Sequence, residues 1–260
     1  MTPPEVLVHR DAQLMAQAAA ARLVTRLVDV QAATGSAHVV LTGGRSGTAV
    51  LASLAANPAR DAIDWHALDI WWGDERFLPS GHSDRNETQA RAALLDAVDV
   101  DPARVHPMPA SDGPDGDNPE AAAESYAEEL AKAAHPENRF GVPEFDVLML
   151  GIGEDAHVAS LFPGMPALYE QQRTVVAVRG APKPPPVRLT MTLRAIRAAR
   201  EVWLLAAGQD KAAAARLALE SAGPVQVPAA GARGLQRTLV LLDQSAASRI
   251  PRELNRMASP

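Results

Sequence analysis

The chain has 260 residues, with 25 basic and 31 acidic side chains and a formal net charge of −6 at pH 7. This length fits a single domain with a sizeable core, and the acidic balance argues against nucleic acid or an anionic membrane surface as a partner. Because no cysteine is present, a disulfide framework, a thiolate metal site and a cysteine nucleophile are excluded. The sequence has neither an apolar run long enough to cross a membrane nor a secretory-signal pattern at its N-terminus, so we expect a cytoplasmic protein.

Lysine is scarce, with three residues against 22 arginines, and the three are Lys132, Lys183 and Lys211. A compositional bias that replaces lysine by arginine wherever either will do would explain the scarcity. A lysine that remains is then more often one whose compact ammonium group is needed.

Patterns typical of helices and strands alternate along the chain. They predict an α/β fold, a Rossmann-like, doubly wound and mostly parallel sheet flanked by helices, in one domain over residues 1–260. The first helix is expected over residues 11–34, with Asp11 as its N-cap and Gly35 just past its end.

The remaining elements follow in order. The other expected helices begin after Ser46 or cover residues 84–98 and 119–134. The expected strands cover residues 39–41, 68–72, 145–150, 174–178, 189–193, 202–206 and 238–242. The proline-rich run at residues 182–186 predicts a stiff, extended connection between two strands.

Ligands collect at the carboxyl ends of strands in open α/β sheets, and the first such end is Leu-Thr-Gly-Gly-Arg-Ser-Gly-Thr at residues 41–48. Its glycines and the following helix N-terminus could bind an anion, with the hydroxyl of Ser46 as a further donor. A tight strand-to-helix turn without a ligand is the alternative, because the Walker spacing is absent. A nucleophilic Ser46 is disfavoured, since the nucleophile elbow needs glycine where Thr48 stands.

The second strand end carries three adjacent charges, Asp74, Glu75 and Arg76, directly after an apolar run. An arginine there can hold a phosphate or carboxylate in a two-point fork. The alternative is a local ion-pair cluster that caps the sheet.

The third strand end, Gly-Ile-Gly-Glu-Asp-Ala-His at residues 151–157, matches the dinucleotide fingerprint weakly, because Pro163 stops any following helix too early. The histidine is more informative. His157 lies two residues after Asp155, and a neutral imidazole with an ordinary pKa near 6.5 can take a proton from water. The alternative is that Asp155 is only a helix cap and His157 an ordinary loop residue.

The fourth strand end places Lys211 in the first turn of a helix, where a positive charge is unfavourable unless an anion binds there. A solvated surface lysine is the alternative. Arg188, just before the strand over 189–193, is a further candidate anion contact. The seven histidines show no metal-ligand spacing, so we expect no metal and no cofactor.

Taken in order, these segments resemble the 6-phosphogluconolactonase family, which shares its fold with the glucosamine-6-phosphate isomerases. The resemblance covers about residues 39–242. Five motifs carry it, at residues 42–44, 72–77 with Asn86, 151–163, 188–193, and 199–202 with 208–212. The Ser-Leu-Phe-Pro ending at 160–163 and Arg76 are closer to lactonases than to isomerases. The departures from the family pattern are Ala156, Val158, and Arg45 with Gly47.

The resemblance implies hydrolysis of 6-phospho-D-glucono-1,5-lactone to 6-phosphogluconate, a step of the pentose phosphate pathway, by water attack without a metal. His157 would deprotonate the water and Asp155 would fix the imidazole. Arg76, or backbone N–H groups near Gly153, would stabilise the oxyanion. The implied phosphate and sugar contacts are Gly43, Gly44, Arg45, Ser46, Asp74, Asn86, Arg188 and Lys211.

The implied partner is a small phosphorylated sugar lactone, and we expect a monomer or a weak homodimer. Two rival functions stay open. One is a glucosamine-6-phosphate isomerase or deaminase, and the other is a sugar-phosphate sensor without catalytic activity.

Overall fold

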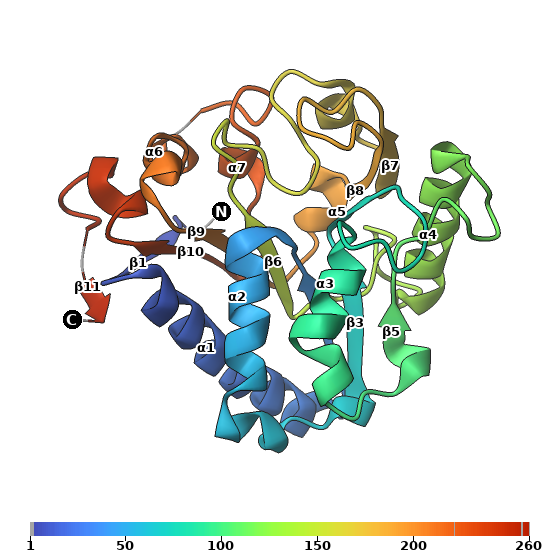
Figure 1. Ribbon diagram of the computed structural model, residues 1–260, viewed down its shortest axis with the longest axis horizontal. Coiled ribbons are helices and arrows are strands. Elements are labelled where there is room, and N and C mark those ends of the chain that lie inside the picture. Colours follow the sequence, from blue (N-terminus) through green and yellow to red (C-terminus); the bar gives the residue numbers. More distant parts are fainter. Residues whose placement is uncertain (1–2, 221, 256, 260) are drawn as a thin grey trace.

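The computed structural model describes residues 3–220, 222–255 and 257–259 (Figure 1). Its helices are α1 (Ala12–Thr34), α2 (Gly44–Ala55), α3 (Asn86–Ala93), α4 (Pro119–Ala133), α5 (Leu193–Ile196), α6 (Ala212–Leu219) and α7 (Pro228–Gly231). Its strands are β1 (Glu5–His9), β2 (Ala37–Leu41), β3 (Leu68–Trp72), β4 (Asp74–Arg76), β5 (Val105–His106), β6 (Val147–Gly151), β7 (Val175–Val178), β8 (Arg188–Met191), β9 (Glu201–Ala206), β10 (Arg237–Asp243) and β11 (Met257–Ser259).

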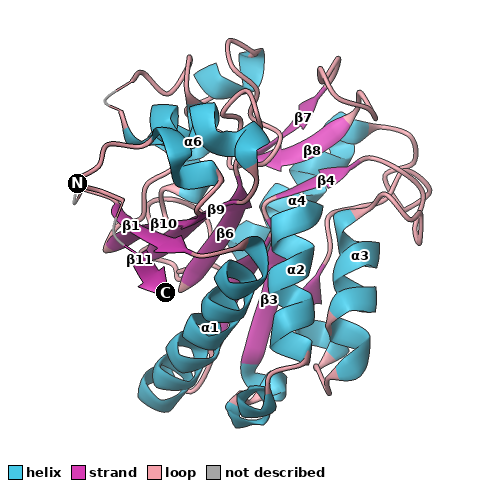
Figure 2. Ribbon diagram, turned by 60° about the vertical axis from the view of Figure 1, so that its left-hand side comes forward, coloured by secondary structure: helices cyan, strands magenta, loops and turns pink. Residues whose placement is uncertain are grey.

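Eight strands form one sheet in the order β11-β1-β10-β9-β6-β2-β3-β5, and every pair described in it is parallel. Helices flank this sheet, with α1, α2 and α3 side by side in front of it (Figures 1 and 2). The predicted α/β fold, one domain with a mostly parallel sheet, is confirmed. None of the helices in the described part is long and apolar enough to span a membrane.

The residues at its two ends define where helix α1 begins and stops. Asp11 accepts a hydrogen bond from the backbone N–H of Leu14 at 2.8 Å, which satisfies a donor that the first turn leaves free. Gly35 closes the helix at a φ of 84°, a conformation that glycine adopts without strain. Both predicted helix boundaries are therefore confirmed.

Two other helices differ from their predicted lengths. Helix α2 begins at Gly44, two residues before Ser46. Helix α3 ends at Ala93 because the backbone of Leu94 turns to a φ of −148°, so the helix predicted over 84–98 is much shorter.

A second sheet, absent from the prediction, has the order β4-β8-β7 with antiparallel pairing. The three charges Asp74, Glu75 and Arg76 form its edge strand β4, which pairs with β8. The strand predicted over 189–193 is also shorter, because Leu193 already begins α5. Strands β1, β5 and β11 were not predicted.

The proline-rich run at 182–186 is a bent loop and not the extended connection that was predicted. The backbone N–H of Ala181 donates to the carbonyl oxygen of Pro186 at 2.9 Å, which closes the loop on itself. The next residue but one, Arg188, begins β8.

The order of strands defines where a ligand can enter. From β2 the chain proceeds to β3 and β5 on one side, whereas from β6 it proceeds to β9 and β10 on the other. Strands β2 and β6 are neighbours. The loops that leave their carboxyl ends therefore diverge, and the crevice between them is the ordinary ligand site of an open parallel sheet.

Candidate functional site

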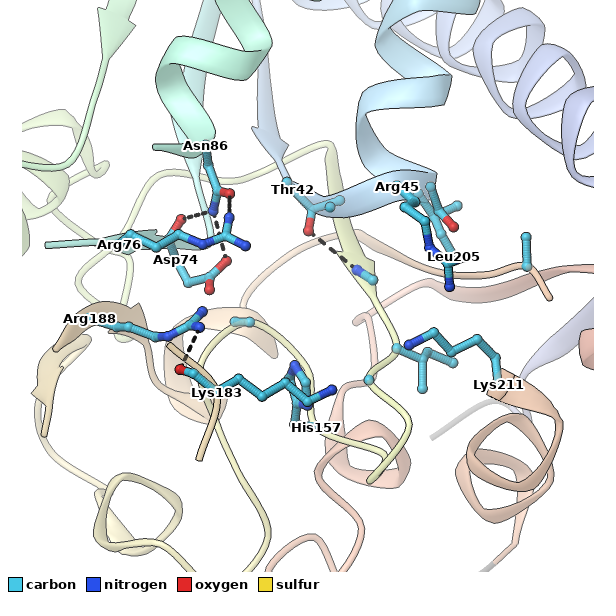
Figure 3. Close-up of a pocket in the computed structure, with 18 of the residues that line it drawn as sticks. Thr42, Arg45, Asp74, Arg76, Asn86, His157, Lys183, Arg188, Leu205 and Lys211 are labelled. Carbon is cyan, nitrogen blue, oxygen red and sulfur yellow. Dashed lines mark hydrogen bonds between the residues drawn. The ribbon is translucent and has the colours of Figure 1, made fainter. Parts of the chain in front are cut away.

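A pocket of about 280 Å³ lies at this crevice, lined by residues that follow β2, β3, β6, β7 and β9 (Figure 3). Ten of the eleven residues predicted for the site line it. They are Gly43, Gly44, Arg45, Ser46, Asp74, Arg76, Asn86, His157, Arg188 and Lys211. The eleventh, Asp155, contacts His157 directly. Five segments far apart in the sequence thus meet at one cavity.

The loop before α2 brings backbone close to the pocket. A Cβ on Gly43 would lie 1.8 Å from Oδ1 of Asn86, so only glycine allows this approach. Gly44 opens the helix at a φ of 76°. The first-turn N–H groups of a helix have no acceptor within the helix, so this end of α2 offers donors and a partial positive charge to an anion.

Strand β4 places its side chains on alternating sides, so Asp74 and Arg76 line the pocket while Glu75 is directed into the protein. Asp74 accepts a hydrogen bond from Oγ of Ser160 at 2.6 Å, and its carbonyl oxygen accepts from Nδ2 of Asn86 at 2.7 Å. Oδ1 of Asn86 in turn accepts from Nη1 of Arg76. The carboxylate, the amide and the guanidinium are thereby held as one polar wall.

Glu75 supports this wall from behind. Its carboxylate accepts hydrogen bonds from the backbone N–H groups of Arg76 at 2.8 Å, Asn86 at 2.6 Å and Glu87 at 2.9 Å. Arg85, the N-cap residue of α3, provides no side-chain cap, so Glu75 caps the helix from the neighbouring strand. Complete burial raises the pKa of Glu75 to about 7, although the charge of Arg85 and these hydrogen bonds oppose the shift.

His157 and Asp155 form a hydrogen-bonded pair at the pocket. Oδ1 of Asp155 contacts Nδ1 of the imidazole, and the ring packs against Phe162 with centroids 4.5 Å apart. A Cβ on Gly153 would lie 2.0 Å from Nδ1, so glycine is needed for the ring to occupy this place. Burial disfavours the charge of Asp155, but its hydrogen bonds with His157 and the charge of that residue outweigh burial and lower the pKa of Asp155 to about 2.

The backbone N–H groups near Gly153 are largely engaged. Those of Ile152, Gly153 and Ala156 donate to carbonyl oxygens of the protein at 3.0, 2.9 and 3.0 Å. The guanidinium of Arg76 is less engaged, because only its Nη1 has a side-chain acceptor within the described residues. Arg76 therefore has more free N–H groups for an oxyanion than the backbone near Gly153.

Cationic side chains occupy both sides of the pocket. Arg45 and Lys211 lie on one side, and Arg76 and Arg188 lie on the other (Figure 3). Nη2 of Arg45 lies 2.7 Å from Asp210, whereas Nζ of Lys211 lies 3.8 Å from the same carboxylate. Burial lowers the pKa of the Lys211 ammonium, which is only 16% exposed.

One cationic side chain of the pocket was missed as a site residue. Lys183 lines the cavity from the loop at 182–186, which was predicted only as a connection. The scarcity of lysine was the available signal, since two of the three lysines of the chain line this pocket. Among the described residues, no group of three or more His, Asp or Glu side chains is arranged to hold a metal ion.

The alanine that departs from the family pattern lies in an unusual conformation. Ala156 has a φ of 64°, in the left-handed region, and its side chain is fully buried. Glycine adopts this conformation without steric conflict, whereas alanine is strained there. Alanine in place of glycine at position 156 therefore adds strain to the backbone between Asp155 and His157.

Comparison with known proteins places this geometry in a family. Residues 10–241 match the family described as glucosamine-6-phosphate isomerases/6-phosphogluconolactonase. The chain is 64% identical to the 6-phosphogluconolactonase of Streptomyces coelicolor, over 98% of each chain. It is 48% identical to that of Mycobacterium tuberculosis, over 93% of this chain and 96% of the relative.

Solved structures agree on the fold. The 6-phosphogluconolactonase from Trypanosoma brucei superposes with a TM-score of 0.82 at 28% identity, covering 96% of this chain and all of that one. A monomeric glucosamine-6-phosphate deaminase superposes with a TM-score of 0.76 at 20% identity, covering 94% of this chain and 99% of that one. The second likeness shows the shared fold alone.

Proposed function

Because the chain belongs to the glucosamine-6-phosphate isomerase/6-phosphogluconolactonase family, we propose that it hydrolyses 6-phospho-D-glucono-1,5-lactone to 6-phosphogluconate. The 64% identity to a 6-phosphogluconolactonase supports the reaction. The observation that carries the proposal in this chain is the His157–Asp155 pair in a pocket lined by cationic side chains. Such a pocket suits an ester that carries a phosphate.

His157 is the proposed general base. Because Asp155 engages Nδ1, that nitrogen carries the proton of the neutral ring, and Nε2 is left to accept a proton from water. The hydroxide equivalent adds to the lactone carbonyl carbon, and the bond from that carbon to the ring oxygen then breaks. The ring oxygen leaves as a hydroxyl group with the proton that Nε2 returns. Such a base contributes about 10²–10⁴-fold to a rate.

Arg76 is the proposed oxyanion donor. The negative charge that develops on the lactone oxygen would meet N–H groups of Arg76 that Asn86 does not use. One well-placed donor of this kind lowers a barrier by about 3 kcal/mol. A strained cyclic ester is a reactive electrophile, so a base and one oxyanion donor are sufficient chemistry without a metal.

The phosphate is proposed to bind at the N-terminus of α2, against Gly43, Gly44 and Ser46, with Lys211 as the facing cation. Helix N-terminal N–H groups and an ammonium are the ordinary partners of a phosphate dianion. Arg45 has the same location but is paired with Asp210, so we assign it a weaker contact.

Asp74 and Asn86 are proposed to bind sugar hydroxyl groups. Both side chains are buried and fixed by hydrogen bonds, Asp74 by Ser160 and Asn86 by Arg76. A fixed carboxylate with remaining lone pairs accepts hydrogen bonds from neighbouring hydroxyls. The ring would then lie between this polar wall and His157.

The test is hydrolysis of 6-phosphoglucono-1,5-lactone against a blank without enzyme, because the lactone also opens spontaneously. Acceleration proportional to protein concentration is the expected result. Ammonia released from glucosamine 6-phosphate would instead indicate the isomerase or deaminase. Binding of 6-phosphogluconate with no acceleration of lactone hydrolysis would indicate a sensor.

A further inference from the structure

The pocket contains one cation whose charged group has no partner within the described residues. Five cationic side chains line the cavity, namely Arg45, Arg76, Lys183, Arg188 and Lys211. Four of these donate hydrogen bonds or form ion pairs within the protein. The ammonium of Lys183 has neither among the residues described, and it is therefore available to a ligand.

The guanidinium of Arg188 is largely committed to the loop that carries Lys183. Its Nη2 donates to the carbonyl oxygens of Lys183 at 3.0 Å and Pro184 at 3.1 Å, and its Nε donates to that of Pro185 at 3.2 Å. An arginine has five N–H donors, so three are used on consecutive carbonyls. The Arg188 side chain is also buried and lies over the ring of Phe162.

This arrangement fixes the place of Lys183. The loop is closed by the hydrogen bond from Ala181 to Pro186, and Arg188 ties its three central carbonyls to β8. Figure 3 shows the Lys183 side chain extending from Arg188 into the pocket, in the direction of Lys211. The lysine side chain is thereby attached to a loop whose backbone accepts four hydrogen bonds.

We propose that Lys183 binds the phosphate of the substrate and that Arg188 acts through it as a positioning residue. The inference rests on the proposed function, since it names a further contact for the same sugar phosphate. It also reassigns Arg188, which the sequence indicated as a direct anion contact.

Two ammonium groups that face one pocket repel each other until an anion lies between them. Burial lowers the pKa of Lys211, and the charges of Lys183 and Arg45 act in the same direction, whereas the charges of Asp210 and Glu154 oppose the shift. A phosphate dianion removes this repulsion and gains from both charges, so the pair favours a phosphorylated ligand over a neutral one.

The test uses Lys183→Ala and a matched control, Lys132→Ala. Lys132 lies on the exposed face of α4, with its side chain 77% exposed. We expect Lys183→Ala to raise KM for 6-phosphoglucono-1,5-lactone by about 10- to 100-fold with little change in kcat, as for the loss of a charge-assisted contact. Turnover of unphosphorylated glucono-1,5-lactone should be unchanged, and Lys132→Ala should resemble the parent with both substrates. An unchanged KM in Lys183→Ala would overturn the proposal.

Arg188 is tested by a double-mutant cycle with Arg188→Lys, which keeps the charge but cannot reach three carbonyls. If Arg188 acts through Lys183, adding Arg188→Lys to Lys183→Ala should raise KM no further. Additive increases would show that Arg188 contacts the phosphate itself.

Failure of the proposed function is distinguished by calorimetry with 6-phosphogluconate, which needs no turnover. If the parent protein binds this ligand and Lys183→Ala binds it at least 10-fold more weakly, the inference stands even where lactone hydrolysis is absent. Equal affinity of the two proteins would overturn the inference while leaving the hydrolytic function intact.

Discussion

Oγ of Ser160 donates a hydrogen bond of 2.6 Å to Oδ2 of Asp74, although the two residues are 86 positions apart in the sequence. Both side chains are buried, and Asp74 lines the pocket. The bond joins the loop after β6 to the edge strand of the second sheet. It therefore fixes the carboxylate that we propose for contact with sugar hydroxyls.

Removal of this bond by Ser160→Ala should lower kcat/KM for the phosphorylated lactone by about 10- to 100-fold. A hydrogen bond to a charged group contributes about 1.5–3 kcal/mol, and Asp74 would lose its fixed orientation. The comparison is Ser80→Ala, at an exposed serine, which should have parental kinetics. Parental kinetics in Ser160→Ala would show that Asp74 needs no support from Ser160.

Replacement of His157 by alanine should lower kcat by about 10²–10⁴-fold, because the proposed base is removed. The ring also contacts Phe162, so folding should be checked by the thermal unfolding midpoint. His82→Ala, at an exposed histidine, serves as the control. A folded His157→Ala protein with near-parental kcat would exclude His157 as the base.

Asp155→Asn separates orientation from charge. Burial alone would raise the pKa of Asp155, but its hydrogen bonds and charge interaction with His157 lower the pKa to about 2. An asparagine can still contact the ring but no longer carries the negative charge that stabilises an imidazolium, so we expect a lower kcat with little change in KM. A parental kcat in Asp155→Asn would argue that the charge of Asp155 does not support the base.

Ala156→Gly should increase the free energy of unfolding by about 0.5–1 kcal/mol. Relief of the left-handed conformation gains about 1–2 kcal/mol, and the greater freedom of glycine in the unfolded chain offsets part of this. Ala21→Gly, at an exposed position in the middle of α1, should instead lower the free energy of unfolding by about 1 kcal/mol. Urea unfolding measures both, and destabilisation of both variants would refute the strain at Ala156.

His106 makes stability dependent on pH. Burial lowers its pKa, but hydrogen bonds and charge interactions with Asp69 and Glu129 prevail and raise it to about 9. The folded state thus holds the proton more tightly than the unfolded state, whose pKa is near 6.5. The stabilisation is complete below pH 6.5 and is lost as the pH rises through about 9.

His106→Asn should therefore show a smaller fall in the free energy of unfolding between pH 6.5 and 9.5 than the parent, by on the order of 2 kcal/mol. The nearby Arg104 and His38 are present in both proteins, and His82→Asn controls for an exposed histidine. Equal pH dependence of His106→Asn and the parent would contradict the assignment.

Five strands of the parallel sheet were predictable because they are apolar runs, and the first helix was predictable from its end signals. The pairing of the small sheet was not. Strand β4 consists of Asp74, Glu75 and Arg76, which show no strand pattern, and it exists because β8, more than a hundred residues later, supplies its hydrogen bonds. The start of α3 at Asn86 was also hidden, since its cap is Glu75 on another element.

The candidate site was largely predictable from motifs, but Lys183 was not. Its side chain lines the pocket from a loop whose carbonyl oxygens accept hydrogen bonds from Arg188. Nothing in the proline-rich sequence of this loop reveals that contact. Likewise, the family departure at Ala156 could be read from the sequence, whereas its positive φ could only be seen in the structure.

The pocket combines segments that follow β2, β3, β6, β7 and β9, so no continuous stretch of the chain contains it. Pairing of distant parallel strands is slow compared with the formation of single helices. During refolding from denaturant, regain of helical circular dichroism should consequently precede regain of lactone turnover. The time course of regained activity would then report the last long-range strand pairing and not early compaction.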